Sequence, residues 1–366
     1  MREWRRMKIL LIGRALGNFR TSMLCWFRAH QRDLPWRRSR DPYRIWVAEV
    51  MLQQTRIAAV IGYYHRFLTR FPTVQSLACA PETDVLKLWS GLGYYSRARN
   101  LHRAAKIIVT QHQGQFPRDL DAALELPGIG AYTAAAVLSI AYDVPLAVLD
   151  GNVARVLARI KAICGDLHAP KNWRALSTAA QDFLAAQAPS DWNQSLMELG
   201  EVVCTPQSPR CTECPVARHC RAYAQGLTDE IPASRRKRAP VHMKIAAAIL
   251  RDPRGRTLLV RDPGAHDTVL FSRMWQFPAV EVTNHPKAEL EEYLRTTLSI
   301  TKISLEELPT ARHGVTFRNI TLLPFLAPVS ELPKLPRTRI LGLKNLSNLP
   351  ISSATRKIAA AAANSA

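Results

Sequence analysis

The sequence has no apolar run long enough to cross a membrane. Its longest apolar stretch is the alanine-rich segment 131–142, whereas a spanning helix needs about 20 such residues. Acidic residues are also scarce, since 29 Asp and Glu face 50 Lys and Arg, which leaves a formal charge of +21. With 47% hydrophobic and 22% charged residues, the composition is that of a folded chain and excludes wholesale disorder. We therefore expect a basic, water-soluble globular protein.

The excess of positive charge indicates a polyanionic partner, and nucleic acid is the first candidate. A protein from a basic proteome, or one that binds a membrane surface, would have the same composition. At ~150 residues per domain, the 366 residues predict about two domains. The basic segment 1–32 superficially resembles a transit peptide, but its apolar spacing from Leu16 to His30 is that of a helix face, so we expect it to fold.

Hydrophobic spacing divides the chain into two domains. Within 16–224, apolar residues recur every three or four positions and the breaks contain Pro, Gly or Asp, which predicts an all-helical domain over 1–228. The charged segment 229–240 has no periodicity and is expected to be a linker. We assign no function to 351–366, which resembles a fraying helix or a tail.

The second domain, 241–350, is predicted to be a smaller α/β domain. Its patterns indicate strands over 241–250, 257–261 and 320–329, and one helix over 287–298.

Four of the seven cysteines lie within 17 residues with the spacing C-x6-C-x2-C-x5-C, namely Cys204, Cys211, Cys214 and Cys220. In a cytosolic chain, clustered thiols indicate metal ligands before disulfides, because that compartment keeps them reduced. Zinc would normally be held by two C-x2-C pairs, and only one is present, so an iron–sulfur cluster is favoured. The remaining cysteines stand singly in apolar helical segments and are predicted to be buried: Cys25, Cys79 and Cys164.

A glycine-containing turn is predicted between two helices at 126–135. Gly128 and Gly130 let the backbone turn sharply and approach another molecule closely. The helix that follows offers unpaired N–H groups and its positive dipole end, which can bind a phosphate without reading a base. Many ordinary helix hairpins contain such a turn, but Asp150, about twenty residues further on, strengthens the interpretation. Asp150 also suits the N-cap of a helix beginning near Asn152.

Glu49 lies in a predicted helix with apolar neighbours on nearly every side. Burial there would disfavour the charged form and raise the pKa of its carboxyl group. The same pattern also fits a surface Glu on a helix that faces another way.

Together, the hairpin 126–132, Asp150 and the four-cysteine loop resemble the helix-hairpin-helix DNA glycosylases of the endonuclease III superfamily. Further segments narrow the resemblance to adenine DNA glycosylases of the MutY type: Leu34-Pro35-Trp36-Arg37, Glu49-Val50-Met51-Leu52-Gln53-Gln54-Thr55 and Gly91-Leu92-Gly93-Tyr94-Tyr95-Ser96-Arg97-Ala98-Arg99-Asn100. The resemblance runs continuously over about 16–224. It implies a base-excision repair enzyme with a 4Fe-4S cluster.

The resemblance also implies catalytic roles. Glu49 matches the family's general acid, which would protonate the departing adenine. Asp150 would stay ionised and stabilise the oxocarbenium-like sugar, while Asn152 would hold Asp150 or the attacking water. Tyr132 stands where strand-cleaving relatives carry a lysine that forms a Schiff base. It therefore implies a monofunctional glycosylase, with Tyr132 lining the pocket and helping to position Glu49 or water.

Because a stacked base is inaccessible, the nucleotide must be extruded from the duplex. The resemblance implies that Gln54 and Tyr94 insert around the estranged base, which is the base left without its partner in the duplex. It also implies that Trp36, Arg37 and Gln194 contact the adenine and the adjoining DNA backbone. Arg210 could contact a phosphate or be solvated. The implied partner is double-stranded DNA with adenine opposite 8-oxoguanine or guanine. We expect a monomeric, cytoplasmic, nucleoid-associated prokaryotic protein that binds no membrane.

Residues 241–350 resemble the family's nudix-like C-terminal domain, which helps to recognise 8-oxoguanine. Trp275-Gln276-Phe277-Pro278 and Arg312-His313 carry this resemblance. The acidic run of a catalytic nudix box is replaced by scattered Glu residues, so magnesium-dependent hydrolysis is not expected. The family's Phe-Ser-His loop reads Val315-Thr316-Phe317 here. Thr316 could replace the serine and His313 remains a candidate contact, but the missing histidine predicts weaker 8-oxoguanine discrimination.

Two alternatives remain. An endonuclease III-like glycosylase/lyase acting on oxidised pyrimidines is disfavoured by Tyr132 and by the second domain. An iron–sulfur protein that binds DNA or transfers electrons without catalysis is disfavoured by Glu49 and Asp150.

Overall fold

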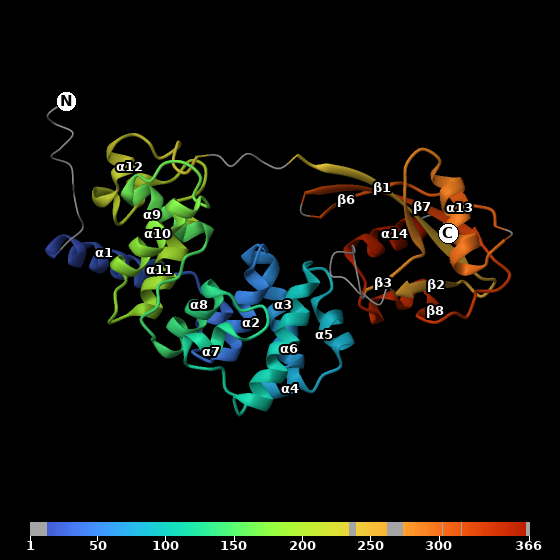
Figure 1. The fold of residues 1–366 in the computed structure, drawn as a ribbon, viewed down its shortest axis with the longest axis horizontal. Helices are drawn as coiled ribbons and strands as arrows, with labels where there is room; N and C mark the ends of the chain where they lie inside the picture. The colour runs from blue at the N-terminus through green and yellow to red at the C-terminus, as the bar shows by residue number, and fades with distance from the viewer. Residues whose placement is uncertain (1–12, 234–238, 262–273, 302, 316, 364–366) are drawn as a thin grey trace. The chain divides into compact units, whose positions relative to one another are not determined.

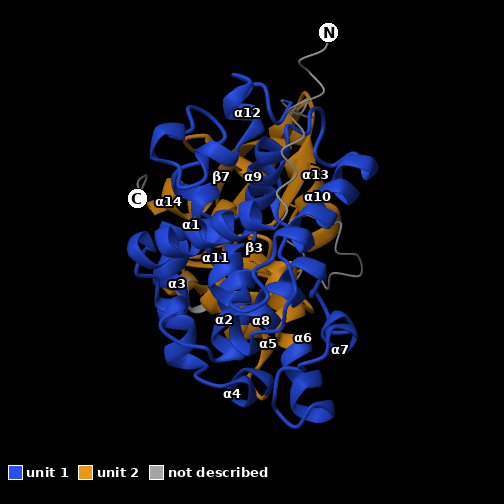
Figure 2. Ribbon diagram, turned by 90° about the vertical axis from the view of Figure 1, so that its left-hand side faces the viewer, with its two compact units in different colours: residues 1–78, 103–236 blue, residues 79–102, 237–366 orange. Residues whose placement is uncertain are grey.

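The computed structural model describes residues 13–233, 239–261, 274–301, 303–315 and 317–363 (Figure 1). The chain forms two compact units, one from residues 1–78 and 103–236 and the other from residues 79–102 and 237–366 (Figure 2). The first unit is helical and the second contains a β-sheet. The predicted fold class, a helical domain followed by a smaller α/β domain, is confirmed.

The first unit consists of helices and short 3₁₀ turns. Its helices are α1 (Arg14–His30), α2 (Pro42–Leu52), α3 (Ile57–Arg70), α4 (Val74–Ala78), α7 (Leu120–Leu124), α8 (Ala131–Tyr142), α9 (Gly151–Lys161), α10 (Pro170–Phe183), α11 (Pro189–Val202) and α12 (Arg221–Ala224). The 3₁₀ turns are η2 (Pro35–Arg37), η3 (Cys211–Glu213) and η4 (Ala217–His219). Helix α6 (Tyr95–Gln111) has residues in both units. The α1 helix confirms that the segment following Leu16 folds.

Helices α2 and α8 pack against each other in the interior of the helical unit. Asp41 caps α2 by accepting a hydrogen bond from Tyr43 N at 2.9 Å, and Pro42 occupies the first turn, as helix starts favour. Eight consecutive residues of α8, from Thr133 to Ile140, are buried. A helix that is apolar all round belongs in a core, so α2 and α8 provide a rigid base for the side chains they carry.

The second unit contains helices and a mixed sheet. Its elements are α5 (Glu82–Trp89), β1 (Val241–Arg251), β2 (Arg256–Arg261), β3 (Trp275–Gln276), β4 (Ala279–Val282), α13 (Pro286–Leu298), β5 (Glu306–Glu307), β6 (Ala311–Val315), β7 (Arg318–Pro328), β8 (Thr338–Gly342), η5 (Leu343–Asn348) and α14 (Ser353–Ala363). The strands and the helix predicted from the sequence are confirmed by β1, β2, β7 and α13.

The sheet has a helix on each face. Strand β1 runs parallel to β7 along its whole length and antiparallel to β2 and β4. Its side chains alternate between two cores: Ala246 and Leu250 pack in the core that includes residues of α13, and Ala247 and Ile249 pack in the core that includes residues of α14. This period of two is that of a strand buried on both sides. The unit is therefore a three-layer α/β/α structure.

Three details differ from the sequence-based expectations. The segment following residue 351 contains a packed helix, because Ala354, Ile358 and Ala362 of α14 are buried in the core. Residues 79–102 belong to the second unit, where Arg356 Nη2 donates to Ser90 Oγ at 2.9 Å. The prediction that the three single cysteines are buried is wrong: the structure exposes Cys25, Cys79 and Cys164.

Within the described ranges, no helix combines the length and hydropathy that crossing a membrane requires.

Candidate active site

The helical unit contains a pocket of about 910 Å³ between α2, α8, α9, α11 and the η2 turn. Most of the residues predicted to act on DNA line it, namely Trp36, Arg37, Glu49, Gln54, Tyr132, Asp150, Asn152 and Gln194. These residues come from positions far apart in the sequence, so the fold brings them together. Pockets of this size are typical of sites for small ligands.

Glu49 lies in α2 with only 5% of its surface exposed, so its predicted burial is confirmed. Tyr132 Oη, from the first turn of α8, donates a hydrogen bond to Glu49 Oε2 at 2.8 Å. Burial raises the pKa of the Glu49 carboxyl from 4.5 to about 7; the Tyr132 hydrogen bond opposes this rise and the nearby Asp150 charge adds to it. A carboxyl with this pKa is partly protonated at neutral pH and can serve as a proton donor.

Asp150 is the N-cap of α9, as predicted, and accepts a hydrogen bond from Val153 N at 2.7 Å. Burial raises the pKa of its carboxyl group above the usual value, and the backbone N–H groups of Val153 and Asn152 and the charge of Arg155 offset only part of this rise. These donors stabilise the ionised form. The pocket thus contains two carboxyl groups in different settings, one held by a phenol and the other by the start of a helix.

The resemblance implied that Asn152 holds Asp150 or water, but the hydrogen bonds of its side chain go to two other residues. Its Nδ2 donates to Glu201 Oε1 at 2.9 Å, and its Oδ1 accepts from Arg155 Nη2 at 3.0 Å. Only the backbone N–H of Asn152 supports Asp150. The Asn152 amide is therefore fixed in the pocket wall between an acid and a base. Gly200 makes this arrangement possible, because a Cβ there would lie 2.9 Å from Asn152 Cβ.

A third buried carboxylate, Glu198 in α11, was not among the predicted site residues; its side chain is 1% exposed. Arg32 Nε donates to Glu198 Oε1 at 2.7 Å and Arg37 Nη2 donates to Glu198 Oε2 at 2.8 Å. The Arg37 side chain is only 11% exposed, and its guanidinium forms part of the pocket wall. The apolar neighbours of Glu198 in α11 were the available signal, as they were for Glu49.

The predicted hairpin is present before α8. Gly128 has a φ of 78°, in the left-handed region that favours glycine, and Gly130 is the N-cap of α8. Both glycines are exposed, and a Cβ on Gly130 would meet nothing within 4 Å. The backbone N–H groups at this helix start are thus accessible to a phosphate.

The other predicted contacts are in varied settings. Trp36 is buried with its ring edge-on to Tyr64 at 5.5 Å, Gln54 is exposed with a φ of 56°, and Gln194 Nε2 donates to Ser190 Oγ at 3.2 Å. Arg210 pairs with Glu213 at 3.0 Å and also donates to Val202 O. Its guanidinium is therefore engaged within the protein.

Two predicted contacts belong to the second unit, and a third lies outside the described residues. Tyr94 is 40% exposed and has a φ of 48°, while the Arg97 guanidinium lies 5.3 Å from its ring centre. His313 lies in β6 beside a pocket that Arg312 and Asn319 also line, and burial lowers the pKa of its imidazole. Thr316 is the residue outside the described ranges.

The four clustered cysteines are half-buried in the loop following α11. Burial raises the pKa of the Cys214 thiol to about 12, and the charges of the thiol groups of Cys204, Cys220 and Cys211 raise it too. Arg159 Nη1 lies 3.3 Å from Cys204 Sγ, as a donor to a thiolate would. In the described part of the chain, no group of three His, Cys, Asp or Glu side chains is placed to hold a single metal ion. Four thiols with a cationic donor fit an iron–sulfur cluster, which Cys₄ sets hold.

The fold and this pocket define a base-excision DNA glycosylase of the helix-hairpin-helix class. Residues 47–179 match the model of HhH-GPD superfamily base excision DNA repair proteins. Residues 204–220, which contain the four cysteines, match the iron–sulfur binding domain of endonuclease III. The chain accordingly carries a 4Fe-4S cluster.

More specific similarities come from curated proteins. The adenine DNA glycosylase of Mus musculus is 35% identical over 397 aligned residues, which cover 93% of this chain and 77% of the mouse protein. The Homo sapiens adenine DNA glycosylase is 45% identical over 225 residues, which cover 59% of this chain and 41% of the human protein. The chain belongs to the adenine DNA glycosylase family.

Solved structures show the same fold in the helical part. A thermostable thymine-DNA glycosylase aligns with a TM-score of 0.53 at 29% identity, covering 57% of this chain and 97% of that protein. Endonuclease III in a non-covalent complex with DNA aligns with a TM-score of 0.51 at 23% identity, covering 60% of this chain and 99% of that protein.

Proposed function

We propose that this protein is a monofunctional adenine DNA glycosylase that removes adenine paired with 8-oxoguanine or guanine, leaving an abasic site. The observation that carries the proposal is the placement of Glu49, Tyr132 and Asp150 in one pocket. Family membership supports the choice of adenine, since the similar mouse and human proteins are adenine DNA glycosylases.

Glu49 is the general acid of the proposed reaction. Adenine is a poor leaving group as an anion, so a proton must reach the base as the bond from the sugar C1′ to the base nitrogen breaks. The raised pKa of Glu49 keeps that proton available near neutral pH. The hydrogen bond from Tyr132 fixes the orientation of the carboxyl group in the pocket.

Asp150 stabilises the positive charge that develops on the sugar. A fixed carboxylate beside an oxocarbenium-like centre lowers the barrier electrostatically, and the donors at the start of α9 hold this carboxylate in place. Water then adds to C1′ and gives up a proton to a pocket carboxylate, which completes the hydrolysis. Asn152, fixed by Glu201 and Arg155, orients that water.

Tyr132 makes the enzyme monofunctional. A phenol cannot form an imine with the sugar, and strand cleavage through a Schiff base requires an amine. The burial of Tyr132 also raises the pKa of its hydroxyl well above 10, so it stays a neutral hydrogen-bond donor.

DNA is held through its backbone and its extruded nucleotide. The exposed turn at Gly128 and Gly130 binds a phosphate at the start of α8, and the net charge of +21 favours a polyanion. The adenine enters the pocket between Trp36 and Gln194, while Gln54 and Tyr94 occupy the space left in the duplex. We expect a monomer to suffice, in the nucleoid of a prokaryotic cytoplasm.

The 4Fe-4S cluster is held by the thiolates of Cys204, Cys211, Cys214 and Cys220. It supplies structure to the loop that follows α11, and Arg159 supports the Cys204 thiolate. The second unit contacts the opposite base through the region of His313. The Val315 to Phe317 segment lacks the family's histidine, so discrimination of 8-oxoguanine from guanine is weaker than in proteins with the Phe-Ser-His loop.

A single-turnover assay tests this function. The purified protein is mixed with duplexes that contain adenine opposite 8-oxoguanine, adenine opposite guanine, or thymine glycol opposite adenine. We expect release of adenine from the first two duplexes and none of thymine glycol. Release from the thymine-glycol duplex alone would assign the protein to the endonuclease III-like alternative, and binding without any release would indicate a non-catalytic protein.

A further inference from the structure

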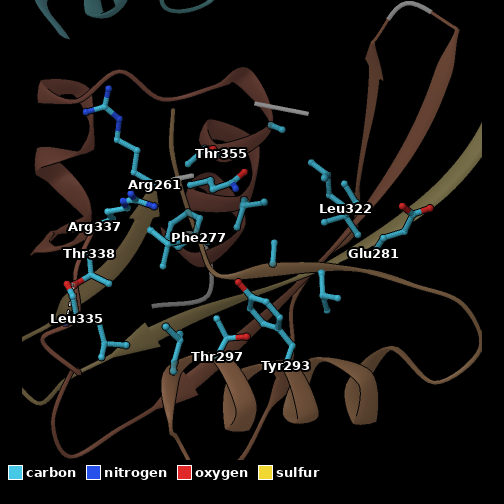
Figure 3. Close-up of a pocket in the computed structure, with 18 of the residues that line it drawn as sticks. Arg261, Phe277, Glu281, Tyr293, Thr297, Leu322, Leu335, Arg337, Thr338 and Thr355 are labelled. Atoms are coloured by element: carbon cyan, nitrogen blue, oxygen red, sulfur yellow. Dashed lines mark hydrogen bonds between the residues drawn. The ribbon is translucent and has the colours of Figure 1, made fainter. Parts of the chain in front are cut away.

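Acidic side chains distinguish the pocket of the helical unit from a pocket of similar size in the second unit. The pocket of the second unit has a volume of about 800 Å³, and the exposed Glu281 is the only acid among the described residues that line it (Figure 3). The pocket of the helical unit is lined by Glu49, Asp150, Glu198 and Glu201. The excision chemistry proposed above uses Glu49 and Asp150, and it leaves the buried Glu198 without a role.

The acceptor sites of the Glu198 carboxylate are all occupied. Its Oε1 accepts from Arg32 N at 3.2 Å and from Arg32 Nε at 2.7 Å, and its Oε2 accepts from Arg32 Nη2 at 2.9 Å and from Arg37 Nη2 at 2.8 Å. A carboxylate offers about four lone-pair sites to donors. Glu198 therefore has no site left for a base or for water, which excludes it as a substrate contact and as a general base.

These hydrogen bonds join two walls of the pocket. One wall is the segment 32–37, which carries Trp36 and is closed on itself where Arg37 Nη1 donates to Arg32 O at 3.2 Å. The other wall is one face of α11, formed by residues three, four and seven positions apart, namely Gln194, Met197, Glu198 and Glu201. Glu198 thus holds the segment that carries Trp36 against the helix face that carries Gln194.

The same hydrogen bonds balance positive charge beside Glu49. Burial raises the pKa of Glu49 to about 7, and the hydrogen bond from Tyr132 and the positive charge of Arg37 oppose this rise. The Arg37 guanidinium is mostly buried and lies 5.3 Å from the ring centre of Phe27, which fixes its position. Without the Glu198 carboxylate, this fixed charge beside Glu49 would have no counter-charge.

Several elements bring charged or titratable side chains to the pocket that Glu49 lines. They are Arg32 and Arg37 from the segment before α2, Arg56 before α3, Tyr132 of α8, Asp150 at the N-cap of α9, and Glu198 and Glu201 of α11. After burial, the groups that shift the pKa of Glu49 are Tyr132, Asp150 and Arg37. Of these three, Arg37 is the one bonded to Glu198, so a change at Glu198 reaches Glu49 through Arg37.

We propose that Glu198 is a positioning residue for adenine excision, which acts through Arg32 and Arg37 to fix the Trp36 wall beside Gln194 and to balance the positive charge next to Glu49. This inference rests on the proposed function, in which adenine enters between Trp36 and Gln194. A misplacement of about 1 Å can lower a rate about 100-fold. Contacts to the DNA backbone set the register of the duplex, so loss of Glu198 affects the rate of release more than duplex binding.

The charge balance is tested without turnover. The full-length, cluster-containing protein is labelled with ¹³C in the side-chain carboxyl groups of glutamate, and the Glu49 signal is identified by its loss in Glu49→Gln. Titration by NMR should give a pKa of Glu49 that is lower in Glu198→Gln than in the parent by about 0.5 or more, because Arg37 loses its counter-charge. An unchanged or higher pKa of Glu49 would overturn the proposal.

Single-turnover kinetics on a duplex with adenine opposite 8-oxoguanine test the position of the wall. In folded Glu198→Gln, the rate constant at saturating enzyme should fall about 10- to 100-fold. The enzyme concentration at half-maximal rate should change less than about threefold. A loss of stability alone would lower the active fraction, and thus the amplitude, while the rate constant stayed at the parent value; that result would overturn the proposal.

Two further variants complete the test. Glu198→Asp retains the charge on a side chain one methylene shorter, so it should restore the pKa of Glu49 and only part of the rate constant. Asp191→Asn is the matched control, because it removes a carboxylate of the same helix from an ion pair with Arg28 at 2.9 Å outside the pocket lining, and it should match the parent. If the parent released no adenine, the proposed function would fail, and the NMR titration would still decide whether Glu198 controls the charge beside Glu49.

Discussion

Tyr132 Oη donates a hydrogen bond to Glu49 Oε2 across 2.8 Å, and this contact joins two helices that begin 89 residues apart in sequence, α2 at residue 42 and α8 at residue 131. The bond places a neutral phenol against a carboxyl group whose pKa burial raises to about 7. A lysine at position 132 would pair with the same carboxylate as a cation and stabilise its ionised form. Tyrosine instead leaves a substantial fraction of Glu49 protonated.

Replacement of the acid is the first prediction. Glu49→Gln should lower the single-turnover rate of adenine release by roughly 10²- to 10⁴-fold, because the proton donor is lost. Duplex affinity, measured by fluorescence anisotropy, should change little, because the turn at Gly128, which we propose binds a phosphate, is untouched. Glu125→Gln, at an exposed position of the same unit, is the control and should match the parent. Equal release rates from Glu49→Gln and parent would remove Glu49 from the mechanism.

The pH dependence of release provides a second prediction. Because Glu49 must be protonated to act, the rate should be highest below a pKa of about 7 and fall as the pH rises through it. The Tyr132 hydrogen bond lowers this pKa, so Tyr132→Phe should shift the alkaline limb to higher pH while lowering the rate. Tyr142→Phe, which removes a hydroxyl bonded to Phe116 O, should leave the limb in place. A Tyr132→Phe limb at lower pH than that of the parent would contradict the assignment.

The sequence was sufficient to predict the helical domain, the strands β1, β2 and β7, and the burial of Glu49. These features depend on local patterns: residue spacing, caps and a glycine turn. The pairing of Arg37 with Glu198 could not be predicted in this way, because the two residues are 161 positions apart and only the packed fold makes them neighbours. The packing of α14 was missed for a similar reason: 351–366 resembled a fraying helix or a tail, and its alanines gain their stability by packing on the sheet.

Because residue 132 is a tyrosine and carries no amine, the third prediction concerns the products of the reaction. Borohydride added during the reaction should trap no covalent protein–DNA adduct, because no imine forms for it to reduce. The product strand should remain intact until alkali cleaves it at the abasic site. Denaturing gels run with and without alkali, and with and without borohydride, measure both outcomes. Stoichiometric trapping would show that another amine attacks the sugar and that the enzyme is bifunctional.

The cluster ligands form the fourth prediction. The purified protein should be yellow-brown and contain about four iron atoms per chain. Cys211→Ser should lose most of this iron and the visible absorption, since an alcohol is a poor substitute for a thiolate ligand. Cys25→Ser, at one of the exposed cysteines outside the cluster, should retain both. A colourless zinc protein, or unchanged iron content in Cys211→Ser, would contradict the ligand assignment.

The fifth prediction concerns Glu198, which neutralises Arg32 and Arg37 in the pocket wall. Burial alone would raise the pKa of Glu198, but the two arginines lower it below its usual value. The pairing therefore stabilises the fold above about pH 4.5, and this stabilisation is lost as the pH falls through the lowered pKa. Glu198→Gln should reduce the free energy of unfolding at pH 7 by about 3 kcal/mol, because it leaves the mostly buried guanidinium of Arg37 without its counter-charge. Urea denaturation measures this loss. Glu213→Gln removes an exposed partner of Arg210 and should reduce the free energy of unfolding by less than about 1 kcal/mol. Equal losses in the two variants would show that the buried pairing contributes no more to stability than the exposed one.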